Sequence, residues 1–307
     1  SIRSSPPIVA GEFDSRWLAA RRLLHFSLNG RPGGDAWFGQ PSRDVASNDW
    51  QLPIALTARG LAGSELAAPV VFSATGYSLD AESENPTRSL SLRFLSEGAA
   101  GFVGSASACY GTNLLPVAGA DLLGSLFWEQ LRSGQPVGAA LQSAKRSFAA
   151  RALEDQGYLD GDDQKTLLQF VLLGDPLLAV FETSWAGGEP PTEVGISSTD
   201  LLCNHDGDRR GNGQVDPRTV RAAVEVLALR CPEAVDGAVR IHRRSSCDGL
   251  CGQSIHPDDE SMTERATGIT SVTSRTDLAQ PDGSHLIRFA RATVGADGRI
   301  VKTLVSR

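Results

Sequence analysis

Residues 23–30 have the sequence LLHFSLNG, and residues 68–78 have the sequence APVVFSATGYS. Each contains a short apolar run that gives way to small or polar residues. Together with AAGFVGSA at residues 99–106, these runs predict three buried strands. Because longer stretches with helical spacing of apolar residues lie between and after them, the pattern predicts βαβ units. The fold class expected for this part of the chain is therefore α/β, with a mostly parallel sheet flanked by helices.

The helices are expected between and after these strands. The predicted segments are a helix over residues 89–97, a second over 120–134, a third over 137–153, and a helix that passes into a strand over 165–176. Gly98 and Gly134 are expected to end the first two helices, because glycine favours the position just after a helix. Asp160, Asp162 and Asp163 are interpreted as a solvated acidic loop.

Composition limits the classes of function. The chain has 307 residues, of which 41% are hydrophobic and 21% charged, and this length predicts two domains. A formal net charge of −7 argues against attraction to nucleic acid or to an anionic membrane surface. No stretch reaches the roughly 18 consecutive apolar residues that a membrane-spanning helix needs. The expected partner is a peptide or protein ligand.

The composition changes sharply after the first 180 residues. We expect a first domain over residues 1–182, a Pro- and Gly-rich linker over 183–198, and a small Cys-containing domain over 199–307. Residues 243–285 have weak periodicity and many Ser, Thr and Asp residues, so irregular structure is expected there. Two alternating runs around Asp297-Gly298 predict a C-terminal β-hairpin.

The order and spacing of the segments across residues 12–182 carry a resemblance to a known family. The segments are WFGQ at 37–40, APVVFSATGYS at 68–78, SLSLRFLSEGAAGFVGSASACYG at 89–111, ADLLGSLFWEQLRSGQPVGAALQSAK at 120–145 and DQKTLLQFVLLGDPLL at 163–178. Together they resemble the gingipain-type cysteine peptidases. The resemblance implies a caspase-like fold and, where the catalytic residues are present, cysteine-type endopeptidase activity.

The two catalytic positions of that family are substituted in this chain. In the family a histidine at the end of the first strand is the general base, and a cysteine at the end of the second attacks the peptide carbonyl. The matching positions are Asn29 and Gly76. Asparagine cannot take up a proton at neutral pH, and glycine has no nucleophile. Because the neighbours Arg31 and Thr75 also depart from the family pattern, we expect a natural pseudopeptidase that acts in binding or scaffolding.

An alternative keeps the protein an active cysteine-type endopeptidase. Cys109 lies in the tetrapeptide ACYG, which resembles the family's nucleophile motif, and His25 lies in the opening strand. His25 precedes Asn29 by four residues, however, which is roughly 13 Å along a strand at about 3.3 Å per residue. We therefore interpret His25 as a histidine of the core or facing a helix, and Cys109 as a small buried apolar residue.

One loop of the second domain resembles an EF-hand or dockerin calcium loop. Asp208, Asn212 and Asp216 match ligand positions 1, 5 and 9, and a helical segment follows. Arg210 at position 3 and Thr219 at position 12 remove two ligands and add a cation, so the site is a degenerate one. Calcium is the one cofactor that the sequence indicates. A surface or secreted calcium-dependent module is accordingly a third hypothesis for function.

Four cysteines lie close together in the second domain, which allows two disulfides or a metal site. They are Cys203, Cys231, Cys247 and Cys251. A zinc site would draw on His205, His242 or His256, but the usual spacing of paired ligands is missing. We favour the disulfides Cys203–Cys231 and Cys247–Cys251, which require an oxidising compartment. Localisation stays open, with a secreted or cell-surface place slightly favoured.

Overall fold

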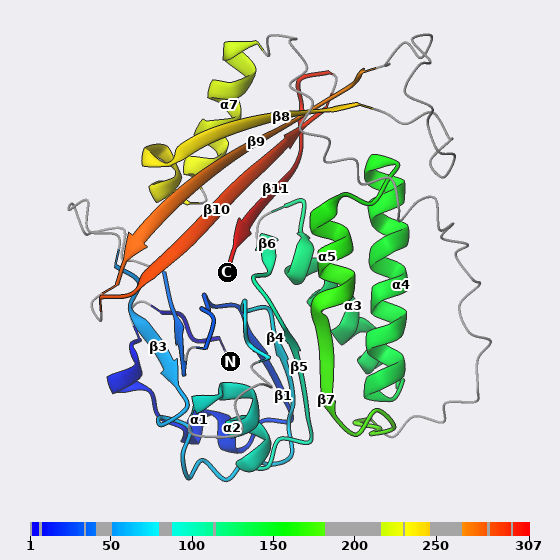
Figure 1. Ribbon diagram of the computed structural model, residues 1–307. Coiled ribbons are helices and arrows are strands. Elements are labelled where there is room, and N and C mark those ends of the chain that lie inside the picture. The colour runs from blue at the N-terminus through cyan, green and yellow to red at the C-terminus, as the bar shows by residue number, and fades with distance from the viewer. Residues whose placement is uncertain are drawn as a thin grey trace, which may run out of the picture.

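The computed structural model in Figure 1 contains two main sheets, with helices packed against each of them. The residues that it describes are 2–5, 8–33, 35–40, 51–79, 88–112, 115–181, 216–229, 231–245, 266–280, 283–295 and 297–307. Among the helices of these segments, none is both long and apolar enough to cross a membrane.

The first sheet, sheet A, has four strands in the order β1-β4-β5-β7. They are β1 (Leu23–Phe26), β4 (Val70–Ser73), β5 (Gly101–Ser105) and β7 (Phe170–Gly174). Strands β1, β4 and β5 are parallel, and β7 runs antiparallel to β5. The prediction of a mostly parallel sheet flanked by helices is confirmed.

Both faces of sheet A are buried, which explains why its strands are continuous apolar runs. On one face Phe72 packs in a cluster with α3 (Gly119–Arg132) and α4 (Val137–Gln156). On the other face the neighbouring Val71 packs in a second cluster, which includes residues of α2 (Leu90–Ser96). Successive residues of a strand point to opposite faces, so the two cores meet at the sheet.

Several short elements complete this part of the chain. They are η1 (Ala10–Glu12), α1 (Arg16–Ala19), the paired strands β2 (Ala36–Phe38) and β3 (Ile54–Thr57), and α5 (Gly161–Gln169). Gly98 and Gly134 follow α2 and α3 with φ of 103° and 93°, as expected of residues that end helices. The helix expected over residues 137–153 continues to Gln156 and ends at Gly157, whose φ is 80°.

The second sheet, sheet C, has five strands in the order β6-β11-β10-β9-β8, all antiparallel. They are β6 (Tyr110–Thr112), β8 (Ala238–Ser245), β9 (Ala266–Ala279), β10 (His285–Val294) and β11 (Ile300–Ser306). The hairpin expected around Asp297-Gly298 is formed by β10 and β11. Strand β6 follows Cys109 directly, so sheet C includes a piece of the chain between β5 and α3.

The expectation of irregular structure over residues 243–285 was wrong for the fourteen residues of β9, whereas residues 246–265 lie outside the described residues. The alternation of β9 is hidden by polar residues at inward positions. Ser274 is buried, for example, and its hydroxyl donates to the carbonyl oxygen of Ala234 at 2.7 Å. A hydroxyl satisfied in this way can occupy a core position, which a count of apolar residues does not reveal.

One face of sheet C is covered by a helix. The helix α7 (Pro217–Ala228) is followed by η3 (Pro232–Asp236), and Leu227 of α7 packs in a cluster with Val272 of β9 and Ala290 of β10. Asp216 caps α7, because its carboxylate accepts the backbone N–H of Arg218 at 2.9 Å. The helix expected after the calcium-like loop is therefore present.

Truncation of Leu123 in α3 is expected to destabilise the protein strongly. Leu123 is fully buried against sheet A, so Leu123→Ala should cost about 2–5 kcal/mol of the free energy of unfolding. Leu168 in α5 is 80% exposed, and Leu168→Ala should change that energy by no more than about 0.5 kcal/mol. Urea denaturation of both variants measures the difference, and equal effects would contradict the packing described above.

Candidate functional site

The candidate site lies at the edge of sheet A where the parallel strands end. Strands β1 and β4 pair in register from Leu23 with Val70 to Phe26 with Ser73, so their carboxyl ends meet. The edge brings together the segments that follow β1, β4 and β5. In parallel sheets this is the edge at which ligands and catalytic groups gather.

Asn29 serves at this edge as a structural tie. Its side chain is buried and donates from Nδ2 to the carbonyl oxygens of Phe38 at 3.2 Å and Gly39 at 3.0 Å. Its backbone also pairs with that of Phe38 in both directions. The amide thus joins the end of β1 to β2, and it has no basic nitrogen that could accept a proton.

The backbone approaches so closely at Gly30 and Gly76 that neither position has room for a side chain. A Cβ added to Gly30 would clash with the carbonyl oxygen of Gly76. A Cβ added to Gly76 would clash with the carbonyl oxygen of Arg307, and it would lie 3.2 Å from the backbone nitrogen of Cys109. Gly76 is therefore packed against the backbone of Arg307 and of Cys109.

Cys109 is fully buried and donates its thiol hydrogen to the carbonyl oxygen of Ala74 at 3.3 Å. Burial raises the pKa of the Cys109 thiol to about 12. Since the thiolate is the nucleophilic form, this cysteine is in its unreactive form at neutral pH.

His25 lies on β1 and faces α3. Its ring stacks on Phe72 with 5.6 Å between the centroids, and its Nδ1 accepts the indole N–H of Trp128 at 2.9 Å. An acceptor nitrogen must be unprotonated. Burial of the ring face that packs against neighbouring residues lowers the pKa of His25. Another part of the side chain is exposed to solvent. The hydrogen bonds of His25 and Cys109 thus go to Trp128 and Ala74, and not to each other.

Arg307 is the residue that fills the space beside Gly76. Strand β11 pairs with β6, and the N–H of Arg307 then donates to the carbonyl oxygen of Cys109 at 2.9 Å. The Arg307 guanidinium donates from Nη1 to Asp121 Oδ1 of α3 at 2.6 Å, and each of these side chains is 10% exposed. Sequence reasoning missed both residues, because nothing in the alternation of β11 indicates which strand it joins.

Comparison with known protein families identifies one match within the chain. Residues 48–181 match the model of peptidase family C25. This region is therefore similar to peptidase family C25. The resemblance to the gingipain-type peptidases, which the sequence analysis drew from residues 12–182, is thereby supported for residues 48–181. No curated protein and no solved structure matched the chain.

The C25 match begins after His25 and Asn29, and it includes Gly76 and Cys109. Strand β1, which precedes the matched residues, nevertheless completes sheet A by pairing with β4. The family match thus includes Gly76 and Cys109, whereas His25 and Asn29 are described by the geometry alone.

A second cluster of charges joins α5, which lies inside the C25 match, to sheet C, and the sequence predicted a solvated acidic loop there. That prediction was wrong. Asp160 caps α5 by accepting the N–H groups of Asp162 and Asp163, and Asp163 in turn accepts the N–H of Asp160. Lys302 of β11 donates to Asp160 at 2.8 Å and to Asp163 at 2.7 Å. Arg291 of β10 pairs with Asp162.

Burial makes the proton affinities of this cluster unequal. Burial raises the pKa of Asp163 to about 6, against the opposing effect of Lys302. Burial would also raise the pKa of Asp160, but Lys302 and the backbone N–H of Asp163 hold it below its ordinary value. Burial would lower the pKa of Lys302, and the two carboxylates raise it instead. One ammonium thus serves two buried carboxylates, and Asp163 is the one that protonates first.

The expected metal and disulfide residues are placed only in part. Asp216 caps α7, whereas Asp208 and Asn212 lie outside the described residues, so the calcium site stays a prediction. No group of three or more metal-ligating side chains occurs within the described segments. Cys231 is a buried free thiol, not half of the expected disulfide with Cys203. Cys203, Cys247 and Cys251 fall outside the described residues.

Substitution of Gly76 tests the close approach of Arg307. Gly76→Ala should lower the free energy of unfolding by about 1–3 kcal/mol, because the new methyl group must displace backbone. Gly11 has no atom near its Cβ position, so Gly11→Ala is the matched control and should be nearly neutral. Chemical denaturation of the two variants compares them, and a neutral Gly76→Ala would show that Arg307 does not lie there.

The proton affinity of Asp163 predicts a pH dependence. Its pKa rises from 3.8 to about 6 on folding, so its protonation stabilises the folded state fully below pH 3.8, and this contribution is lost as the pH rises to about 6. Asp163→Asn removes it. The difference in the free energy of unfolding, wild type minus variant, should therefore decrease as the pH rises from 4 to 6. A flat difference measured by denaturation across this range would contradict the assignment.

Proposed function

We propose that the C25 region is a pseudopeptidase domain, used for binding or scaffolding and not for peptide hydrolysis. The observation that carries the proposal is the packing of Gly76. The position that matches the family's nucleophile has no side chain, and the carbonyl of Arg307 occupies the space that one would need. A covalent mechanism requires a nucleophile at this place, with room for the substrate carbonyl beside it.

The surroundings of Asn29 support the same proposal. A histidine at this position would have to leave both carbonyl oxygens that the amide now binds, those of Phe38 and Gly39. The tie between β1 and β2 therefore depends on the amide group that replaced the base. The mostly parallel sheet with helices on both faces is compatible with the caspase-like arrangement that the family resemblance implies.

The second candidate function is an active cysteine-type endopeptidase that uses Cys109. The observation in its favour is that Cys109 lies inside the matched C25 residues and at the same edge as Gly76. Against it stand the pKa of about 12 for the buried thiol and the hydrogen bond of His25 to Trp128. A working dyad would need a hydrogen bond between nucleophile and base, which these two residues do not make.

An activity assay of the wild type and two variants distinguishes the two candidates. The full chain is incubated with Arg- and Lys-terminated reporter peptides, and separately with a thiol-reactive peptide probe. We expect no hydrolysis above the background of reagents, and no difference between the wild type and Cys109→Ala. Cys231→Ala is the matched control, because Cys231 is also a buried thiol with its pKa raised by burial to about 12. Hydrolysis that Cys109→Ala abolishes and Cys231→Ala preserves would overturn the pseudopeptidase proposal.

Restoration of the family residues provides a further arm of the assay. In Asn29→His with Gly76→Cys, the new thiol would have to displace Arg307 before any substrate could reach it. We expect this double variant to remain inactive and to be less stable than the wild type. Peptidase activity in a variant of undiminished stability would show that the site is intact apart from its two side chains.

A further inference from the structure

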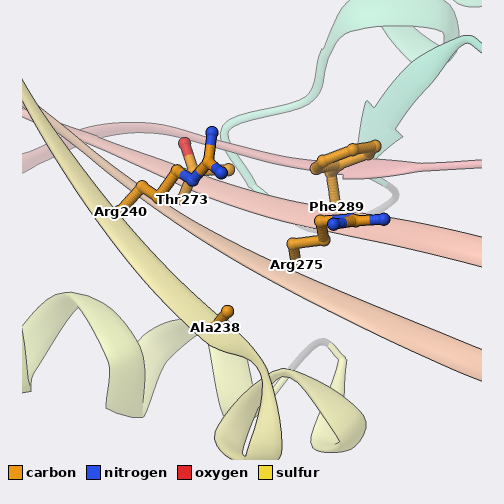
Figure 2. A pocket seen from close by; sticks show the side chains of 5 residues that line it. All are labelled: Ala238, Arg240, Thr273, Arg275 and Phe289. Atoms are coloured by element: carbon orange, nitrogen blue, oxygen red, sulfur yellow. The ribbon is translucent and has the colours of Figure 1, made fainter.

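The face of sheet C opposite α7 contains a hollow of about 250 Å³ (Figure 2). Its lining residues come from three neighbouring strands, and they are Ala238, Arg240, Thr273, Arg275 and Phe289. On β9 and β10 these residues alternate with those that pack against α7, so they point to the other side of the sheet. The hollow lies apart from the edge of sheet A described above.

The register of the strands explains the shape of the hollow. Arg275 is paired with Ala238 on one side and with Phe289 on the other, and Arg240 is paired with Thr273. Each of the two arginines thus has a smaller residue, Ala238 or Thr273, as its cross-strand neighbour. Ala238 and Thr273 form the floor, while the two guanidinium groups and the ring of Phe289 form the sides.

The two arginines of the hollow lack the partners that other cations of the same face have. Arg291 is bound to Asp162, and Lys302 to Asp160 and Asp163, at the first turn of α5. Arg291 also donates from Nε to Thr273 Oγ1 at 3.1 Å, so the ionic interface reaches the border of the hollow. Beyond it, Arg240 and Arg275 are exposed and make no ion pair with any described residue.

This arrangement makes the face complementary to carboxylates. On this face, Arg291 and Lys302 already bind carboxylates of the chain itself. The guanidinium groups of Arg240 and Arg275 project from the same face of the sheet. Since the chain has a net charge of −7, two unpaired arginines on one face do not follow from a generally basic composition. Guanidinium groups form paired hydrogen bonds with carboxylates, and this chemistry defines the ligand.

The spacing indicates how such a ligand would be arranged. Arg240 and Arg275 are diagonal neighbours on adjacent antiparallel strands, which places their Cα atoms about 7–8 Å apart. In an extended segment, residues i and i+2 are separated by about 7 Å and point to the same side. Acidic residues at alternate positions of an extended segment therefore match the two guanidinium groups.

The outer strand offers a backbone edge for the same segment. Among the described strands β8 has one neighbour, β9, so the hydrogen-bonding groups of its other edge have no strand partner. Val239 and Ile241 of β8 are 41% and 43% exposed on the opposite face. An open strand edge commonly accepts an extended peptide as an added strand.

We propose that this face binds an extended acidic segment of a partner protein, with carboxylates at alternate positions on Arg240 and Arg275. A second copy of the chain fits less well, because symmetric pairing of two β8 strands would bring the arginines of both copies onto the same surface. The proposal does not depend on whether the C25 region is catalytic.

Binding of an acidic peptide to the full chain tests the proposal. The probe is a labelled twelve-residue peptide with Glu and Thr in alternation, and its control has Gln in place of every Glu. We expect fluorescence anisotropy to detect binding of the Glu probe that weakens with added salt. Arg240→Ala with Arg275→Ala should weaken it at least tenfold, and replacement of both by Lys should retain part of the affinity.

The matched control removes two exposed arginines elsewhere. Arg59→Ala with Arg132→Ala changes the net charge equally, and both residues are exposed in the first part of the chain. This variant should bind the probe as the wild type does. Equal weakening in both double variants would overturn the proposal, because attraction would then depend on net charge alone.

Other outcomes would also overturn it. They are absence of binding at up to about 1 mM probe, equal affinity for the Gln control, and self-association that the hollow's double variant abolishes. Preferential binding of single-stranded DNA of equal length through the same arginines would likewise contradict a protein partner. Because the substituted residues are exposed, thermal unfolding should be unchanged, which shows that a loss of binding is local.

Discussion

The pairing of β11 with β6 determines how the two sheets of this protein meet. Strand β6 follows Cys109 directly, and β11 joins it as the central link between sheet C and the edge of sheet A. The same strand places Lys302 against the first turn of α5 and leads to Arg307 beside Asp121. Displacement of β11 would therefore uncover Gly76 and leave several buried carboxylates without their cations.

Such buried ion pairs constrain the geometry more than they stabilise the fold. Taking a lysine and two carboxylates out of water costs energy that their attraction offsets only when the contacts are close. Removing one partner, by contrast, leaves an uncompensated buried charge and costs about 3–5 kcal/mol. Lys302, Asp160 and Asp163 consequently fix one position of sheet C against α5, and alternatives a few ångströms away are strongly disfavoured.

Asn29, Gly30 and Gly76 pack together at one edge of sheet A. At Gly30 and Gly76 the chain has no side chains, and backbone lies where side chains would be. The amide of Asn29 uses the same space to bind two carbonyl groups. A peptidase site needs an open cleft at this edge, whereas this arrangement gives a packed one. Two exposed arginines without an ion pair to any described residue, Arg240 and Arg275, lie instead on sheet C.

The sequence by itself determined the α/β class, the strands and helices of sheet A, the C-terminal hairpin and the C25 relationship. These follow from local apolar runs, from glycines after helices and from the order of segments. It did not reveal β9, because Ser274 and its neighbours hide the alternation with buried hydroxyl groups. It also led to the wrong expectation that Asp160, Asp162 and Asp163 are exposed to solvent.

Only the tertiary structure decided that β9 is a strand, which cations pair with the three aspartates, and which backbone packs against Gly76. The partners of the three aspartates are Lys302 and Arg291, and the neighbour of Gly76 is Arg307, all more than a hundred residues away along the chain. A local pattern states whether a residue suits a strand or a helix. It carries no information about which distant strand supplies the opposite charge or the neighbouring backbone, because that depends on how the sheets pair.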